Sequence, residues 1–482
     1  MTIKKGYIYN LWYQVISIVV PFITVPYTSR VLGPTNLGIN AYTNSIVQYF
    51  TLIASLGVGI YGTRQIAYVK DNKEKRNKVF WGIFYTKFMM SIIVYFIFLI
   101  FIFVWGRKYF TIFLLQSIYI FSVSLDISWF YSGIERFDKL TLRNTIVKIV
   151  GVVLVFLVVK SEKDLIKFIL VAGLSELIGQ LIMWLQIKNY VDFIFIDFHW
   201  VSEHLLPMIR LYIPQFIIQI YTIFDKTIIG LVTTKNEVAY FDMSKKLIST
   251  LTILAASLGT VMLPRISSLV EKDEVEKIRD YLYKSFEFIC YLSIPMVLGL
   301  IVVSDNFISF LLGSSFKRSA LLTKIMAPTI FLISISNLVG IQLMIPFKKE
   351  KEFTISVLSG AIVSIVSNLV LVCYLKSIGA AISFLLSEAA VTMIQFIFTK
   401  NFLNFRYLGR IILKYFTASL TMGFVLISII ALPIENNFIL MILQIVLGLI
   451  YYICFNFIFK STIQMYIFSQ IKIFLEGKRN GF

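Results

Sequence analysis

Long apolar stretches dominate this chain. Fourteen of them, each about 20 or more residues long, are separated by short polar segments. An α-helix needs roughly 20 such residues to cross about 30 Å of hydrocarbon, and ten-residue strands of alternating polarity are absent from the sequence. The sequence predicts an all-α integral membrane protein with about 14 transmembrane helices. The predicted spans are approximately residues 7–29, 39–63, 79–105, 109–134, 141–160, 166–187, 209–232, 237–263, 284–304, 319–345, 353–375, 377–399, 410–432 and 438–459.

The composition agrees with a lipid-facing surface. Hydrophobic residues make up 58% of the 482 residues and charged residues 15%, against about 45–50% and about 25% in soluble domains. A soluble chain of this length would lack the polar side chains to cover its surface, and an apolar chain is not intrinsically disordered. The first span is too long and too polar for a cleaved signal peptide, so we expect it in the mature protein.

The positive charges predict the topology. The chain has 45 Lys and Arg and 26 Asp and Glu, a formal charge of +19. Such a charge can indicate nucleic-acid binding, but here the basic residues cluster between the spans. With the N-terminus inside, 29 of them fall on the cytoplasmic side and 11 on the other, as the positive-inside rule requires. We expect both termini in the cytoplasm, no nucleic-acid partner, and solvated cytoplasmic surface at residues 271–280.

Residues for enzymatic or metal chemistry are scarce. The three cysteines, Cys290, Cys373 and Cys454, lie in apolar stretches and are interpreted as core residues. The two histidines, His199 and His204, share one polar segment. Neither a metal site nor a Ser-His-Asp set can be assembled in the membrane, and no Gly-x-x-x-x-Gly-Lys-Ser/Thr loop occurs. The sequence predicts a transporter rather than an enzyme, without metal, cofactor or nucleotide.

A repeated dipeptide suggests that the chain contains two related halves. Ser175-Glu176 and Ser387-Glu388 both lie in mid-span, 387 − 175 = 212 residues apart, and each is followed by Lys-Asn where its span ends. Six spans separate the copies, and an even number preserves direction, which predicts a parallel repeat of two six-helix lobes plus two C-terminal helices. The predicted parts are an N-terminal lobe (1–190), a cytoplasmic inter-lobe linker (191–208), a C-terminal lobe (209–402), and spans thirteen and fourteen with a cytoplasmic tail (403–482).

Three segments resemble a known family. They are Ser29–Pro34 with Asn36–Gly38, then Asp126–Phe137, and Val261–Arg265. They resemble the polysaccharide-transport branch of the MOP (multidrug/oligosaccharidyl-lipid/polysaccharide) superfamily, and in particular its Wzx-type flippases. The resemblance implies two lobes in a V shape, a central cavity and alternating access.

The resemblance also implies a cargo and a location. The cargo would be an undecaprenyl-pyrophosphate-linked oligosaccharide repeat unit, moved across the bacterial cytoplasmic (inner) membrane for capsule, O-antigen or exopolysaccharide synthesis. The protein would be a monomer in contact with membrane lipid, with a polysaccharide polymerase as a further partner.

By resemblance, spans one, two, seven and eight line the cavity. Lysines on these spans suit a phosphate that must be held and released. The alternative is that the basic chains lie near the outer interface and snorkel. Asp242 is placed to pair with Lys245 or Lys246 on one helical face. The candidate substrate-binding residues are Arg30, Asn44, Gln48, Asp225, Lys226, Lys245 and Lys246.

Further charges within the spans are candidates for ion coupling or for structural pairs. Lys87, Asp126 and Lys148 lie at one depth, roughly 10–13 Å from the cytoplasmic ends of their spans, which suggests one cluster. Glu176 and Glu388, like Asp242, are either ion-coupling sites or hydrogen-bonded groups that pack helices. Glu287 is expected near enough to the cytoplasmic end of its span to snorkel.

Two other functions remain open from the sequence. The first is a cation-coupled multidrug exporter, or an exporter of another lipid-linked precursor such as lipid II or teichoic acid, with the same fold. A multidrug exporter predicts twelve spans. The second is a membrane polysaccharide polymerase, which predicts a large outer loop or a His/Asp catalytic set.

Overall fold

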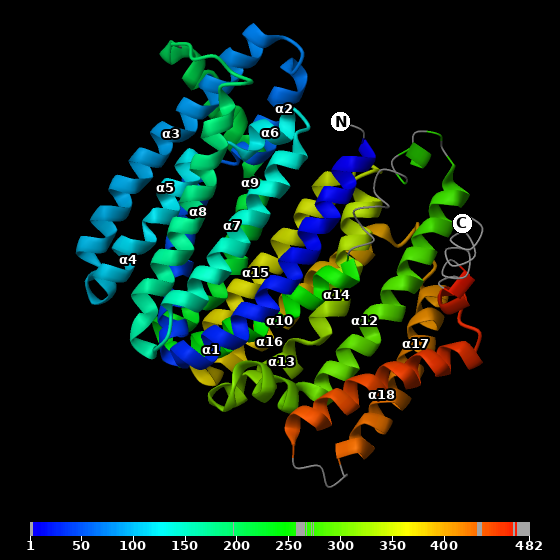
Figure 1. Cartoon of the computed structure of the whole chain (residues 1–482). Coiled ribbons are helices and arrows are strands. Elements are labelled where there is room, and N and C mark those ends of the chain that lie inside the picture. Colours follow the sequence, from blue (N-terminus) through cyan, green and yellow to red (C-terminus); the bar gives the residue numbers. More distant parts are fainter. Residues whose placement is uncertain are drawn as a thin grey trace, which may run out of the picture. The chain divides into compact units, whose positions relative to one another are not determined.

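The computed structural model describes most of the chain. The described residues are 3–195, 197–256, 266, 268–270, 272, 274–430, 436–465 and 468–469, and every regular element among them is a helix. The Val261–Arg265 segment of the predicted resemblance lies outside them, as does the end of the predicted tail. The chain forms two compact units, Met1–Ala239 and Tyr240–Phe482, which are described in turn (Figure 1).

Unit 1 contains helices α1 to α9 and the first residues of α10. Its elements are α1 (Ile3–Ser55), α2 (Val58–Val69), α3 (Lys73–Val104), η1 (Arg107–Tyr109), α4 (Phe110–Gln116), α5 (Ile118–Leu125), α6 (Ser128–Gly133), α7 (Phe137–Val158), η2 (Glu162–Asp164), α8 (Leu165–Ile187), α9 (Phe198–Val232) and α10 (Lys235–Ala256).

The first two predicted spans are continuous in α1. Gly33 interrupts the helix with φ 70° and ψ 173°, a conformation that glycine adopts without the steric penalty of a Cβ atom. The chain between the predicted spans 7–29 and 39–63 therefore forms a sharp kink in one helix rather than an open loop. The second half of α1, which follows the kink, carries the predicted residues Asn44 and Gln48.

An aromatic cluster fixes one end of unit 1. Trp129, Phe130 and Tyr131 of α6 are fully or almost fully buried, and they pack with rings of α3 such as Phe80. Two glycines allow α2 and α6 to approach closely, because a Cβ at Gly62 would lie 2.5 Å from the Trp129 ring and one at Gly133 2.7 Å from Ile66. The Asp126–Phe137 segment thus has a packing role.

The segment between α8 and α9 is tied to the start of α3. Lys73 Nζ lies 2.8 Å from the Asp192 carboxylate, and Trp81 Nε1 donates to the Asp192 carbonyl at 2.9 Å. The Lys73 ammonium and the Asn77 amide lower the pKa of the Asp192 carboxyl. The predicted inter-lobe linker therefore packs on unit 1 at this point.

Unit 2 begins within α10 and continues to the end of the chain. Its later elements are α12 (Val275–Leu312), η3 (Ser314–Phe316), α13 (Lys317–Met326), α14 (Pro328–Asn337), the π-helix η4 (Leu338–Met344), α15 (Glu350–Leu375), α16 (Ser377–Thr399), α17 (Phe405–Ile430) and α18 (Asn437–Ile458). The tenth predicted span is bent by 46° between Met326 and Pro328, where proline interrupts the helical hydrogen bonding.

The all-α membrane fold is confirmed. The described residues contain 11 helices long and apolar enough to cross a membrane, or up to 12 if the bent pair is one span. Two features separate this count from fourteen. Val15–Val69 counts once although it covers two predicted spans, and α10 ends at Ala256, where the described residues stop. The number fourteen stays a prediction.

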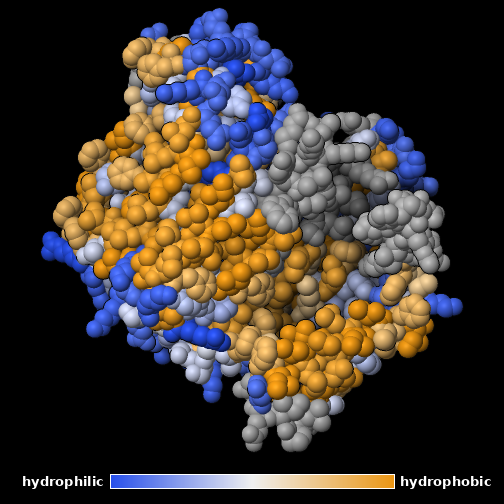
Figure 2. All heavy atoms as spheres, in the orientation of Figure 1, coloured by the Kyte–Doolittle hydropathy of each residue, from blue (hydrophilic) through white to orange (hydrophobic). Residues whose placement is uncertain are grey.

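The surface agrees with lipid contact. Large apolar side chains are exposed along the helices, as at Phe96 and Ile100, each 61% exposed. Figure 2 shows such side chains over the middle of unit 1, with hydrophilic ones gathered where α2 ends and α3 begins. This distribution matches a chain that presents apolar helix faces to hydrocarbon and charged ends to water.

The two Ser-Glu dipeptides occupy similar packing positions in their own units. Ser175 of α8 faces Gly151 of α7, whose added Cβ would lie 3.3 Å from the serine oxygen. Ser387 of α16 donates to the Gly360 carbonyl of α15 at 2.9 Å. In both hairpins a serine thus packs against a glycine of the preceding helix, which supports the interpretation as a repeat. The predicted domain limits themselves stay predictions.

Candidate functional site

The second half of α1 lies very close to the end of α9 and the start of α10 in unit 1. A Cβ at Gly38 would lie 1.7 Å from the Lys235 carbonyl oxygen, and one at Gly230 2.0 Å from Cδ2 of Tyr42. Real Cβ atoms do not approach so closely, so both positions require glycine. We call this region the α1–α9 contact.

Lys235 closes the α1–α9 contact with its side chain. Its Nζ lies 3.4 Å from the centroid of the Tyr42 ring, a cation–π geometry. The same ammonium donates a hydrogen bond to the Gly230 carbonyl near the end of α9, where helix carbonyls lack intrahelical partners. One side chain therefore connects all three helices.

Hydroxyl groups extend the α1–α9 contact in both directions. Ser45 Oγ lies 3.0 Å from Thr227 Oγ1, and the Tyr49 hydroxyl lies 3.2 Å from the same oxygen. At the other end, Thr35 donates to Asn236 Oδ1 at 2.8 Å. In sequence terms this contact joins predicted span two and the residues before it to predicted span seven and the residues after it.

The predicted substrate-binding residues of unit 1 lie in different environments. Arg30 is exposed, while Asn44 and Gln48 are half-buried and joined by a 2.8 Å hydrogen bond from Gln48 Nε2 to Asn44 Oδ1. Asp225 is 1% exposed and Lys226 is half-buried. The amide pair and Asp225 flank the α1–α9 contact on its own two helices.

The predicted residues of α10 that fall in unit 2 include an ion pair and a lysine beside aromatic rings. Lys246 Nζ lies 2.7 Å from Asp242 Oδ2. The Nζ of Lys245 lies 4.6 Å from the Phe384 ring centroid and 5.5 Å from that of Phe241. Lys245 is half-buried and Lys246 is exposed.

Lys87 and Asp126 meet, while Lys148 contacts a different helix. Lys87 is 2% exposed and its ammonium donates to the Asp126 backbone carbonyl. The Asp126 carboxylate accepts from the Ser128 amide at 2.8 Å. Lys148 donates to Ser17 Oγ of α1 at 2.7 Å. Of the three residues predicted to form one cluster, Lys87 and Asp126 are in contact and Lys148 contacts Ser17 instead.

The repeated glutamates differ in burial. Glu176 is exposed on α8, while Glu388 is 7% exposed on α16. Gln180, one turn after Glu176, accepts from Arg143 at 3.2 Å. Gln395, two turns after Glu388, is buried, and neither amide atom has a hydrogen-bond partner among the described residues.

The sequence did not predict a buried polar network in unit 2. Glu287 is 8% exposed rather than snorkelling, because α17 packs over it. Its carboxylate accepts from the Tyr415 hydroxyl at 2.8 Å and lies 3.2 Å from Lys414 Nζ. The Tyr415 hydroxyl also lies 2.7 Å from Ser461 Oγ. This network fastens the region of spans thirteen and fourteen to α12.

Metal chemistry receives no support from the described part of the chain, which holds no group of three or more His, Cys, Asp or Glu able to bind an ion.

A protein-family model matches more than half of this chain. The model of the polysaccharide biosynthesis protein family matches residues 3–270. Among curated relatives, the Escherichia coli (strain K12) protein described as "Putative O-antigen transporter" is 23% identical over 407 residues, covering 83% of this chain and 97% of that protein. The Haloferax volcanii protein described as "Probable low-salt glycan biosynthesis flippase Agl15" is 22% identical over 240 residues, covering 50% of this chain and 51% of that one.

Solved structures share the fold. The lipid II flippase MurJ in an inward closed conformation matches with a TM-score of 0.76 at 17% identity, covering 95% of this chain and 99% of that one. An inward-facing multidrug resistance MATE family transporter of the MOP superfamily matches with a TM-score of 0.61 at 12% identity, covering 84% and 98%. The helical fold of this chain is that of these transporters.

Proposed function

Because this chain belongs to the polysaccharide biosynthesis protein family, we propose that it is a flippase that moves a lipid-linked oligosaccharide across a membrane. Its relatives are named as transporters and flippases, and the chain is a transporter and not an enzyme. The observation that carries the proposal is the match, at 23% identity, along 97% of the protein described as "Putative O-antigen transporter".

The cargo we propose is an undecaprenyl-pyrophosphate-linked repeat unit for capsule, O-antigen or exopolysaccharide synthesis. A pyrophosphate offers acceptor oxygens and negative charge, which lysine and arginine bind. Lys245, half-buried beside Phe384, is the side chain best suited to this contact, with Arg30, Lys226 and Lys246 as further cations. Asn44 and Gln48 retain free amide hydrogens for sugar hydroxyls after bonding to one another.

The mechanism we propose is alternating access, with the α1–α9 contact as one gate. The contact is made by two glycines, a cation over a ring and hydroxyl pairs. Its opening would break the hydroxyl contacts and the cation–π contact, and its closing would form them again. Cargo would leave at this end when the contact opens.

Location and partners follow from the same proposal. The 29:11 division of basic residues supports an inner-membrane protein with both termini in the cytoplasm. We further propose a monomer that passes its cargo to a polysaccharide polymerase. Among the membrane-embedded charges, the Lys87–Asp126 contact has the features of a structural pair, and buried Glu388 is the better candidate for ion coupling.

Deletion of the gene followed by lipid analysis tests the function. Undecaprenyl-linked repeat units should accumulate on the cytoplasmic face and surface glycan should disappear, with both effects reversed by the wild-type gene. Unchanged lipid-linked sugars with altered drug tolerance would instead identify the multidrug exporter, which shares the fold. Accumulated lipid II would identify the other precursor exporter, and single repeat units on the outer face would identify the polymerase.

A disulfide across the α1–α9 contact tests the gate. Thr35→Cys with Asn236→Cys joins side chains whose oxygens lie 2.8 Å apart, in a background where Cys290, Cys373 and Cys454 are replaced. Oxidation should stop export and a reductant should restore it. The control is Asn36→Cys with Glu162→Cys, which links α1 to η2, where the Asn36 amide donates to the Glu162 carbonyl at 2.8 Å. We expect the control link to permit export, and equal inhibition by both links would contradict the gate.

A further inference from the structure

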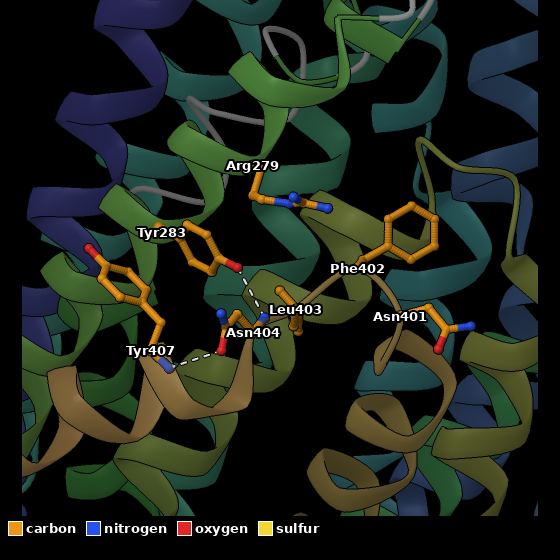
Figure 3. A pocket seen from close by; sticks show the side chains of 7 residues that line it. All are labelled: Arg279, Tyr283, Asn401, Phe402, Leu403, Asn404 and Tyr407. Carbon is orange, nitrogen blue, oxygen red and sulfur yellow. Dashed lines mark hydrogen bonds between the residues drawn. The ribbon is translucent and has the colours of Figure 1, made fainter.

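A cavity of about 380 Å³ lies at one end of unit 2, where α12 begins and α16 connects to α17 (Figure 3). Arg279 and Tyr283 contribute from the first turns of α12, one helical turn apart. The α16–α17 connection and the first turn of α17 provide the rest of the lining. The lining residues are Arg279, Tyr283, Asn401, Phe402, Leu403, Asn404 and Tyr407.

The free polar groups of this cavity are predominantly hydrogen-bond donors. The Tyr283 hydroxyl oxygen accepts from the Asn404 backbone amide at 3.0 Å, so its hydrogen remains free to donate. Asn404 Oδ1 accepts from the Tyr407 amide at 3.2 Å, which leaves its side-chain NH₂ free. The guanidinium of Arg279 adds up to five N–H donors.

The described residues place no carboxylate in the cavity wall to compete for these donors. Among the described residues, the lining contains no Asp or Glu and Arg279 forms no ion pair. Asp280, its neighbour on α12, lies 2.6 Å from Lys284 Nζ. A donor-rich wall with one guanidinium is matched by a ligand rich in acceptor oxygens and negative charge, and phosphate has both properties.

The position of the cavity along the helices corresponds to the membrane surface. Arg279 precedes the predicted span 284–304 by five residues, roughly 7 Å along a helix, and Tyr407 directly precedes the predicted span 410–432. The back of the cavity is apolar, since Tyr283 and Leu403 also border a small space lined by Leu282, Phe286, Leu338, Val339, Leu343 and Leu408. At this depth both lipid headgroups and soluble phosphate compounds can reach the cavity.

We propose that this cavity binds a phosphate group at the membrane surface, held by Arg279, the Tyr283 hydroxyl and the Asn404 side-chain amide. The inference does not depend on the proposed cargo. The phosphate can come from an anionic lipid headgroup or from a soluble phosphate compound, and two binding measurements distinguish these sources.

The test uses the full chain. Native mass spectrometry would count lipids retained from nanodiscs of phosphatidylcholine alone or mixed in equal parts with phosphatidylglycerol. Calorimetry in detergent would measure binding of inorganic pyrophosphate. Arg279→Gln should weaken binding about tenfold or more, since a charge-assisted hydrogen bond contributes about that factor. If the protein retains phosphatidylglycerol but does not bind pyrophosphate, the cavity is a headgroup site. If it binds pyrophosphate, the cavity is open to soluble phosphate.

Two control variants distinguish phosphate binding in the cavity from a general effect of positive surface charge. Arg406→Gln removes the same charge from an exposed neighbour on α17 that does not line the cavity. Arg107→Gln removes it from η1 in unit 1, where the guanidinium donates to the Phe103 carbonyl. Both variants should bind as the wild type does. Binding that is unchanged in Arg279→Gln, or weakened equally by Arg406→Gln, would overturn the proposal while leaving the flippase function untouched.

Discussion

The ammonium of Lys235 lies 3.4 Å from the centre of the Tyr42 ring and donates to the carbonyl of Gly230, whose missing side chain makes room for that same ring. Lysine, tyrosine and glycine therefore depend on one another, although they come from three helices. The ring covers α9 only because residue 230 has no Cβ atom. A change in any of these side chains alters the whole α1–α9 contact.

Gly38→Ala should prevent the α1–α9 contact from closing. Its new Cβ would lie 1.7 Å from a backbone carbonyl oxygen, which cannot rotate away as a side chain could. Overpacking costs about 1–3 kcal/mol, which lowers the equilibrium constant for closing by a factor of about 5 to 150. We expect loss of most glycan export and slower disulfide formation between Thr35→Cys and Asn236→Cys.

Gly59→Ala is the matched control for this change. Its Cβ has nothing within 4 Å, so export and cross-linking should both stay at the wild-type level. Export that is unaffected by Gly38→Ala would show that the contact tolerates a side chain at this position.

Lys87 should prove more important for packing than for charge. The Asp126 carbonyl also accepts from Trp129 Nε1 at 3.1 Å, so Lys87→Met leaves this carbonyl with a donor and fills the space. Lys87→Ala leaves a cavity. The alanine variant should therefore be less stable than the methionine variant by about 2–5 kcal/mol, measured by thermal unfolding in detergent. Loss of export in a well-folded Lys87→Met protein would instead favour ion coupling.

Tyr415→Phe should destabilise unit 2. The change removes the donor at 2.8 Å from the buried Glu287 carboxylate and leaves Lys414 as its partner. A hydrogen bond to a charged group contributes about 1.5–3 kcal/mol, and we expect a loss in this range on thermal unfolding. Tyr374→Phe removes the same atom from a residue that is 82% exposed and should change stability little.

His204 should make stability depend on pH. It lies on α9 before the apolar stretch Gln215–Val232, and its Nδ1 is 2.7 Å from the Tyr61 hydroxyl. Burial lowers the pKa of His204 below its ordinary value of 6.5, although nearby Glu203 opposes this shift. The unfolded chain binds the proton more readily, so stability is full above about pH 6.5 and falls as the pH drops through the lowered pKa.

Thermal unfolding across this pH range checks the assignment. His204→Asn keeps a side chain able to bond to Tyr61, and its unfolding temperature should show a weaker dependence on pH than that of the wild type. An equal dependence in both proteins would assign the effect to another group.

The sequence predicted the membrane fold because apolar length and basic loops are properties of each span alone. It could not predict which helix faces meet. Lys87, Asp126 and Lys148 share one depth, but helix rotation directs Lys148 to Ser17. The dipeptides at Glu176 and Glu388 are identical in sequence, yet one glutamate is exposed and the other buried, because burial depends on the neighbouring helices.

The two sites that the sequence missed combine distant segments. Glu287 is buried only because α17, more than a hundred residues later, covers it. Residues 271–280 contain the charges typical of solvated surface, and Arg279 becomes part of a cavity only when Asn404 and Tyr407 are placed opposite it. Neither relation leaves a signal in local composition or periodicity.

The α1–α9 contact also affects biosynthesis. Thr35 and Asn236 are 201 residues apart, and at about 5–20 residues per second the ribosome needs roughly 10–40 s to make the partner. During that interval the second half of α1 stays in the bilayer without α9. Several of its polar groups are already bonded within the helix, because Gln48 donates to Asn44 and the hydroxyls of Thr43 and Thr51 donate to carbonyls of their own helix. A helix that later forms a gate can thus remain in lipid during synthesis with part of its polar groups already paired within the helix.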